Sequence, residues 1–279
     1  MNKGNGKTIL IFLLAIVWIG GIAWLYFSNT HTSNREVVII DYPASPTPAM
    51  SPEIAQQIDE PIHPRCGDFL CFSNMEFVEL YDLFERKSGV EFFTKYIYQI
   101  PEVDVYIKAK AETRGYKQRG FADESQLVQF ENVRTRPEVR DAYLAMRNEM
   151  LNEGIRLHFV SGYRSSTAQR DIFTDKMKLS DPSVILDGSY DEVLDTVLAV
   201  SAIPGYSKHH SGYTVDFGCG NDYLVYTFAE TECFEWMSQN NFERTKKHGF
   251  IPSYPEGVSN QGPDPEPWEF VWVGIENLK

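Results

Sequence analysis

The chain has 279 residues, of which 43% are apolar, so it is long enough to bury a sizeable core. Its 39 acidic residues outnumber its 26 basic ones, which leaves a formal net charge of −13 at pH 7. Nucleic acid is therefore excluded as an expected partner, because phosphate binding needs clustered lysine and arginine.

The first expected element is a membrane-spanning helix over residues 8–27. This run carries no charge, and at ~1.5 Å per residue it is long enough to cross a ~30 Å hydrocarbon core. Lys3 and Lys7 precede it, so we expect residues 1–7 in the cytoplasm and the remainder on the extracytoplasmic side of the cell membrane. A cleaved signal peptide is the alternative, but its apolar region is usually shorter, at about 7 to 15 residues.

Three further segments follow the expected anchor. Residues 28–64 are rich in proline, serine and threonine, a composition typical of a semi-extended tether. The remaining chain is long enough for one well-buried domain with a small addition. We therefore expect an N-terminal extension at 65–120 and a globular domain at 121–279.

All four cysteines, Cys66, Cys71, Cys219 and Cys233, come after the expected anchor, where an oxidising compartment permits disulfides. We expect the local pairs Cys66–Cys71 and Cys219–Cys233, although four cysteines allow three connectivities. A four-cysteine zinc site is the competing interpretation, but neither pair has the close C-x2-C spacing that such sites favour.

Helices and a few short strands alternate along the exported part, which predicts an α+β fold. Ser73 and Glu76 form a capping-box pattern at the start of a helix that ends near Gly89. Pro137 begins a second helix, which ends at Gly154. The further expected elements are helices over 166–178, 191–200 and 234–241 and strands over 155–160, 213–217 and 268–273.

The segment from Ser207 to Asp216 offers two metal ligands, His209 and Asp216. Zinc accepts imidazole nitrogen and carboxylate oxygen, and a catalytic zinc site needs about three protein ligands plus an open position. The segment from Glu266 to Glu269 is the obvious source of the missing ligand. Arg164 follows the expected strand over 155–160 and carries a planar fork suited to binding a carboxylate.

These segments, in this order, resemble the zinc-dependent D-alanyl-D-alanine carboxypeptidases of the VanY type, the LAS metallopeptidases. The resemblance extends over about residues 121–273 and implies that family's Hedgehog-like fold, a small antiparallel sheet with flanking helices. It implies that His209 and Asp216 bind zinc and that Glu266 is the general base. Arg164 would steady the substrate, a peptidoglycan stem peptide, and the pocket would be shaped by Ser207 and Trp268.

The chain departs from that family at Glu269, where the family's Glu-x-Trp-His pattern places its third zinc ligand, a histidine. In one interpretation Glu269 binds the metal itself, which suits zinc and also admits a harder divalent ion such as manganese. In a second, no metal binds firmly and the domain recognises a peptide without cutting it. In a third, His210 or His248 supplies the missing ligand.

The sequence therefore predicts a membrane-anchored, metal-dependent hydrolase of the D,D-carboxypeptidase type that acts on peptidoglycan stem peptides. A catalytically degenerate domain of the same fold, which binds peptidoglycan or a protein partner, is the alternative. An amidase or an L,D-specific peptidase on the same scaffold is a variant within the enzyme class. His158 lies in the middle of an expected strand and is interpreted as a packed residue.

Overall fold

A computed structural model of the chain describes residues 64–279, all of which belong to one structural unit, Asp59–Lys279. The expected cytoplasmic segment and anchor, and the expected tether up to residue 63, lie outside the described residues. Between residues 64 and 279, no helix has the length and apolar character needed to cross a bilayer.

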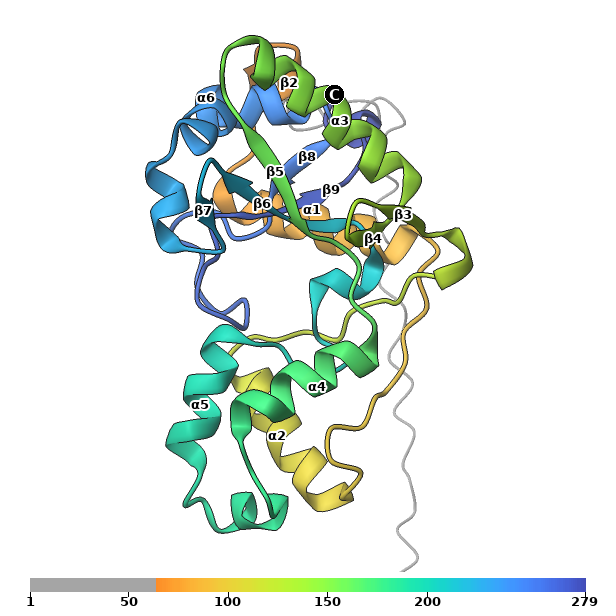
Figure 1. Ribbon diagram of the computed structural model, residues 1–279, viewed down its shortest axis with the longest axis vertical. Coiled ribbons are helices and arrows are strands. Elements are labelled where there is room, and N and C mark those ends of the chain that lie inside the picture. Colours follow the sequence, from red (N-terminus) through yellow and green to blue (C-terminus); the bar gives the residue numbers. More distant parts are fainter. Residues whose placement is uncertain (1–63) are drawn as a thin grey trace, which may run out of the picture. The chain divides into compact units, whose positions relative to one another are not determined.

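The described chain combines six α-helices with short strands, which is the expected mixture of helices and a small sheet (Figure 1). The helices are α1 (Asn74–Lys87), α2 (Pro101–Thr113), α3 (Pro137–Asn152), α4 (Ser166–Met177), α5 (Asp191–Val200) and α6 (Glu232–Lys246). The strands are β1 (Arg65–Cys66), β2 (Phe69–Leu70), β3 (Val128–Phe130), β4 (Val133–Thr135), β5 (Leu157–Ser161), β6 (Thr214–Cys219), β7 (Asp222–Tyr223), β8 (Phe250–Pro252) and β9 (Glu269–Trp272).

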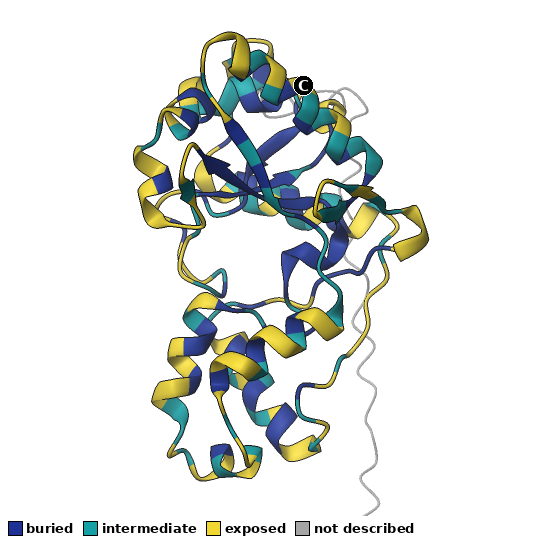
Figure 2. Ribbon diagram, in the orientation of Figure 1, coloured by how far each residue is buried: buried dark blue, intermediate teal, exposed yellow. Residues whose placement is uncertain are grey.

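The principal sheet is antiparallel throughout and has the strand order β5-β6-β9-β8, with β7 paired to the end of β6. Strand β6 is buried along its whole length, because it lies between two neighbours and is covered on both faces (Figure 2). Two small hairpins, β1-β2 and β3-β4, stand outside this sheet. The site described below is built on the central pair, β6 and β9.

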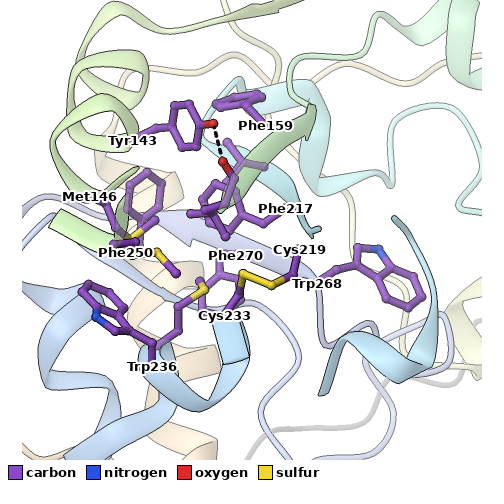
Figure 3. Packing of buried hydrophobic residues seen from close by; sticks show 14 of the residues in the cluster. Tyr143, Met146, Phe159, Phe217, Cys219, Cys233, Trp236, Phe250, Trp268 and Phe270 are labelled. Carbon is purple, nitrogen blue, oxygen red and sulfur yellow. Dashed lines mark hydrogen bonds between the residues drawn. A yellow bond between two sulfur atoms is a disulfide. The ribbon is translucent and has the colours of Figure 1, made fainter. Parts of the chain in front are cut away.

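The main hydrophobic core lies on the face of the sheet that α3 and α6 cover (Figure 3). Tyr143 and Met146 from α3 and Trp236 from α6 pack with Phe217 of β6 and Phe270 of β9. Side chains alternate between the two faces of a strand. The neighbours of Phe217 and Phe270 along β6 and β9 must therefore point to the opposite face.

That opposite face is covered by α1. Phe77 and Tyr81 of this helix pack against Ile251 of β8 and Val271 of β9. The helix begins with the capping box that the sequence predicts, since the Ser73 hydroxyl accepts from Glu76 N and the Glu76 carboxylate accepts from Ser73 N. The segment at 65–90 thus forms part of the folded domain.

A separate core joins α2, α4 and α5, which gather together away from the sheet (Figure 1). Ile107 of α2, Phe173 of α4 and Leu198 of α5 are fully buried in it. Helix α2 belongs to the expected extension at 65–120 and was not predicted from the sequence. Both halves of that extension therefore contribute to the cores of the described region.

Most expected elements occur close to their predicted bounds, and α5 matches residue for residue. The expected helix at 234–241 is wrong in its extent, because α6 spans Glu232–Lys246 with a non-helical interruption at Gln239–Phe242. The Asn241 side chain stabilises this interruption, because it accepts a hydrogen bond from Phe72 N at 2.9 Å and donates one to Phe72 O at 2.7 Å.

Both expected disulfides are confirmed. Cys66 is bonded to Cys71 across the β1-β2 hairpin, and Cys219 at the end of β6 is bonded to Cys233 at the start of α6. No cysteine remains free among the described residues, so the four-cysteine zinc site is excluded. The second bridge ties the sheet to the helix that covers its core (Figure 3).

Candidate active site

Two carboxylates lie side by side at the centre of the sheet. Strands β6 and β9 pair so that Asp216 faces Glu269 directly, one step from the pair Val215 and Phe270. Val215 and Phe270 point into the main core, so Asp216 and Glu269 project from the face that α1 covers. Like charges directly opposite each other destabilise a sheet, and both carboxylates are almost fully buried. A nearby cation or a shared proton would relieve this repulsion.

His209 meets the two carboxylates from a short 3-10 turn, Lys208–Ser211, immediately before β6. Its Nδ1 lies 2.7 Å from the carbonyl oxygen of Gly162, a contact that orients the ring. Its Nε2 is 3.4 Å from Asp216 Oδ2 and 3.3 Å from Glu269 Oε2. Among residues 64–279, this is the one group of three histidine, cysteine, aspartate or glutamate side chains whose possible ligand atoms all lie within 4.8 Å of one another.

The two separations from His209 Nε2 fit a tetrahedral metal ion. Ligand atoms placed ~2.05 Å from zinc at tetrahedral angles are ~3.3 Å apart. The separations of 3.4 and 3.3 Å from His209 Nε2 match that value and exceed an ordinary N–H···O hydrogen bond. In addition, Asp216 Oδ1 is buried with no hydrogen-bond partner among the described atoms. An imidazole held by a backbone carbonyl is also the usual form of a metal-binding histidine.

Burial and neighbouring charges shift the pKa values of the ionisable side chains in the site. Burial raises the pKa of Glu266, and the nearby charges of Glu269 and Asp216 raise it further. Burial opposes ionisation of Glu269, but hydrogen bonding to His209 and the charge of Lys208 outweigh it and hold the pKa of Glu269 below its usual range. Burial lowers the pKa of Lys208 to about 7.

Glu266 lies in the turn that leads into β9. Its carbonyl oxygen accepts a hydrogen bond from Glu269 N at 3.1 Å, which ties the turn to the strand. Its side chain is half-buried and lines the same cavity as the three candidate ligands. A carboxyl group with a raised pKa, at the edge of a cavity and beside possible metal ligands, is suited to carrying a proton.

Arg164 comes from the loop between β5 and α4. Its Nη1 donates to Gln169 Oε1 at 3.0 Å, and its Nη2 donates to Ser161 Oγ at 3.3 Å. Gln169 is itself buried and donates to Ala202 O at 2.6 Å. The guanidinium is therefore held in one orientation by side chains that are fixed in turn.

A cavity of about 340 Å³ brings the predicted residues together. Every residue that the sequence predicts for the site lines it: Arg164, Ser207, His209, Asp216, Glu266, Trp268 and Glu269. Several further lining residues were not predicted, among them Tyr116, Lys117 and Arg119 from the segment at 65–120, and Lys176, Lys208 and Tyr254. The position of Lys208 next to His209 in the sequence could have indicated that it lies at the site. No sequence pattern near the other residues indicates that they line the cavity.

Comparison with known proteins identifies a matching family. The family model for VanY, described as D-alanyl-D-alanine carboxypeptidase, matches residues 132–275, which is just over half of the chain. The chain belongs to the VanY family.

The curated relatives of this VanY-family chain include a D-alanyl-D-alanine carboxypeptidase of Enterococcus faecalis, 28% identical over 151 residues, which cover 52% of this chain and 49% of that protein. The YodJ protein of Bacillus subtilis is 29% identical over 147 residues, with 52% and 48% covered. The chain therefore spans about half the length of the curated relatives it matches.

Solved structures with related folds include VanYB in complex with D-alanine-D-alanine, at 24% identity and a TM-score of 0.40, covering 54% of this chain and 78% of that one. The LdcB LD-carboxypeptidase is 29% identical with a TM-score of 0.43, covering 56% of this chain and 71% of that one.

The other two histidines considered as ligands in this VanY-family chain, His210 and His248, are hydrogen-bonded to other groups. His210 is fully buried against Phe121, its Nε2 accepts from Gly205 N at 3.0 Å, and its Nδ1 lies 2.7 Å from Arg164 O. With both ring nitrogens bonded, His210 has no lone pair for a metal. His248 Nε2 lies 3.0 Å from Glu149 Oε2, outside the lining of the cavity. The carboxylate of Glu269 therefore lies where a third ligand is needed.

Proposed function

We propose that this chain is a metal-dependent D,D-carboxypeptidase that removes the C-terminal residue from peptidoglycan stem peptides. We further propose that residues 8–27 anchor it in the cell membrane, with the domain on the extracytoplasmic side. The observation that supports the activity most is the convergence of a candidate metal site, a proton-carrying carboxyl group and a fixed guanidinium on one cavity. The substrate class is inferred from the names of the relatives reported above.

His209 Nε2, Asp216 Oδ2 and Glu269 Oε2 would hold the metal ion. A bound zinc ion supplies Lewis acidity, which lowers the pKa of water to about 7 and polarises a carbonyl group. Because this set carries two carboxylates and one imidazole, a harder divalent ion such as manganese is a second candidate. The remaining chemistry falls to the protein side chains.

Glu266 would act as the proton carrier. As water adds to the carbonyl carbon, Glu266 accepts one of its protons, and it then delivers that proton to the amine nitrogen when the peptide C–N bond breaks. The raised pKa makes the ionised carboxylate of Glu266 a stronger proton acceptor than that of an ordinary glutamate.

Arg164 would bind the C-terminal carboxylate of the substrate. A carboxypeptidase must recognise that group, and a planar guanidinium can engage it with parallel hydrogen bonds. Gln169 and Ser161 already fix the guanidinium, so little conformational freedom is lost on binding. Ser207 and Trp268 would complete the walls around the terminal residue.

A metal-free peptide-binding domain is the second candidate function. It is favoured by one specific observation, that His209 Nε2 lies 3.4 Å from Asp216 Oδ2 and 3.3 Å from Glu269 Oε2. Burial lowers the pKa of His209, but the charge of Asp216 more than offsets this and holds the pKa above its usual range. An imidazolium between Asp216 and Glu269 would then neutralise the pair without any metal. Such a domain would bind the same peptides and leave them intact.

The deciding experiment uses the full-length chain, reconstituted separately with zinc and with manganese. We expect about one metal ion per chain and release of D-alanine from a peptide that ends in D-alanyl-D-alanine. Asp216→Ala should lose both properties. Asp222→Ala is the matched control, because Asp222 lies on the same sheet but outside the cavity lining.

Absence of metal from the wild-type chain after both reconstitutions would overturn the enzymatic proposal. Peptide binding without metal or cleavage would instead support the second candidate. Release of D-alanine by the metal-free chain would contradict both.

A further inference from the structure

The two oxygens of Glu269 have different surroundings. Oε2 faces His209 Nε2, whereas Oε1 accepts a hydrogen bond from Ser253 Oγ. Ser253 directly follows β8, and its backbone N donates to Glu269 O at 3.0 Å. The backbone and the hydroxyl of one serine thus hold the same glutamate, and both residues are less than 5% exposed.

Lys208 determines which way the Ser253 hydroxyl points. Its Nζ donates to Ser253 Oγ at 2.7 Å and to Ser253 O at 2.9 Å, and it lies 3.5 Å from the ring centroid of Tyr254. A serine hydroxyl has a single proton. Because Lys208 donates to that oxygen, the proton is free to point to Glu269 Oε1, and Lys208 Nζ is itself 3.9 Å from the same atom.

We propose that Ser253, oriented by Lys208, is the positioning residue that presents Glu269 to the metal through Oε2. With Oε1 held by the serine, Oε2 remains the oxygen directed at His209 and the candidate metal position. Metal-binding carboxylates are commonly hydrogen-bonded in this way, and loss of such a partner typically weakens metal affinity about 10- to 100-fold. The inference rests on the proposed function, since it requires that Glu269 bind the metal.

A second buried lysine of this chain, Lys246, differs from Lys208 in what it reaches. Lys246 is also fully buried, and its Nζ donates to Leu70 O at 2.7 Å and lies 5.2 Å from the ring centroid of Phe77. Its environment resembles that of Lys208, but it does not line the cavity. Lys208 therefore differs in reaching a candidate metal ligand.

The test measures zinc affinity of the full-length chain by competition with a chelator. Ser253→Ala should bind zinc about 10- to 100-fold more weakly, and Ser253→Thr, which keeps the hydroxyl, should stay within about threefold of the wild type. Thr245→Val is the control, because it also removes a fully buried hydroxyl, one that donates to Phe242 O at 2.9 Å away from the cavity. Its zinc affinity should not change.

Thermal unfolding in excess chelator separates positioning from a purely structural role. A structural role would lower the metal-free melting temperature of Ser253→Ala without changing its zinc affinity, and that result would overturn the proposal. If the wild-type chain binds no metal, the proposed function fails. If the wild type binds zinc and Ser253→Ala binds it equally well, only the present inference fails.

The part played by Lys208 is tested by a double-mutant cycle. In a Lys208→Met background the hydroxyl is no longer directed at Glu269, so Ser253→Ala should reduce zinc affinity by less than about threefold. An unchanged 10- to 100-fold loss in that background would show that Lys208 does not act through the serine. Lys208→Leu, which also lacks a donor, provides the same comparison if the methionine variant does not fold.

Discussion

The sheet and the group of helices α2, α4 and α5 contribute to the cavity in different ways. From the sheet side come His209, Asp216 and Glu269, all of them less than 5% exposed and set by strand register or by the turn that enters a strand. From the helical side come two cations on or beside α4, the half-buried Arg164 and the exposed Lys176. The candidate metal ligands, which need fixed geometry, thus sit on or beside paired strands, while the proposed substrate-binding groups sit on less buried segments.

The two sides also differ in how they are held together. The sheet core is formed by residues of the family-matched region, with α1 added on the opposite face. The helical core includes α2, which precedes the matched region 132–275. The segment at 65–120 thus contributes α2 to the helical side and α1 to the sheet side.

The largest expected effect comes from the sheet side. Glu266→Gln should lower kcat by about 10²- to 10⁴-fold, because an amide cannot accept the proton from water. Metal content should remain that of the wild type, since Glu266 is outside the group of three candidate ligands. Glu256→Gln, an exposed carboxylate outside the cavity lining, is the control and should keep full activity. Loss of metal from Glu266→Gln would instead make Glu266 a ligand.

The next largest effect is expected from a substitution that tests whether α2 belongs to the helical core. Ile107→Ala removes a fully buried side chain and should lower the free energy of unfolding by about 2–5 kcal/mol, measured by denaturant titration. Val105→Ala in the same helix is the control, because Val105 is 67% exposed and its loss should change stability by less than about 0.5 kcal/mol. Equal effects of the two changes would contradict the packing of α2.

A smaller effect is expected from the substrate-binding cation. Arg164→Lys keeps the charge but loses the planar fork, so KM for a peptide ending in D-alanyl-D-alanine should rise about 10-fold, roughly 1.4 kcal/mol of binding. Arg170→Lys serves as the control, since Arg170 pairs with Asp171 and does not line the cavity. A change in kcat with KM unaltered would assign Arg164 to the transition state instead.

The smallest effect is a pH dependence of the helical side. Hydrogen bonds from Lys110 and Tyr106 lower the pKa of Asp191, so its contribution to stability is present above its unfolded pKa of about 3.9 and is lost as the pH falls through the lowered folded value. Asp191→Asn should therefore lower the melting temperature slightly at pH 7 and by less as the solution is acidified.

Glu192→Gln is the control for that measurement, because Glu192 is exposed on the same helix. An Asp191→Asn difference that stays constant with pH would contradict the assignment of the shift to this ion pair.

Local signals in the sequence were sufficient for several elements. The capping box at Ser73 and the proline at position 137 mark helix starts in the structure, because N-terminal capping depends on residues within one turn. Both disulfides join cysteines close in sequence, where short loops limit the pairing. Helix α2 was missed because apolar Val105 lies on its exposed face, which obscures the buried stripe of Val103, Ile107 and Ala111.

The sequence by itself determined the candidate site residues: an imidazole, three carboxylates and a guanidinium in three separated segments. Only the tertiary structure decided that Asp216 stands opposite Glu269, because the alternation of a strand shows which side chains share a face but not which strand will pair with it or in what register. It also decided that Lys208 and Ser253 meet at Glu269 Oε1, a contact between residues 45 positions apart that no local pattern encodes.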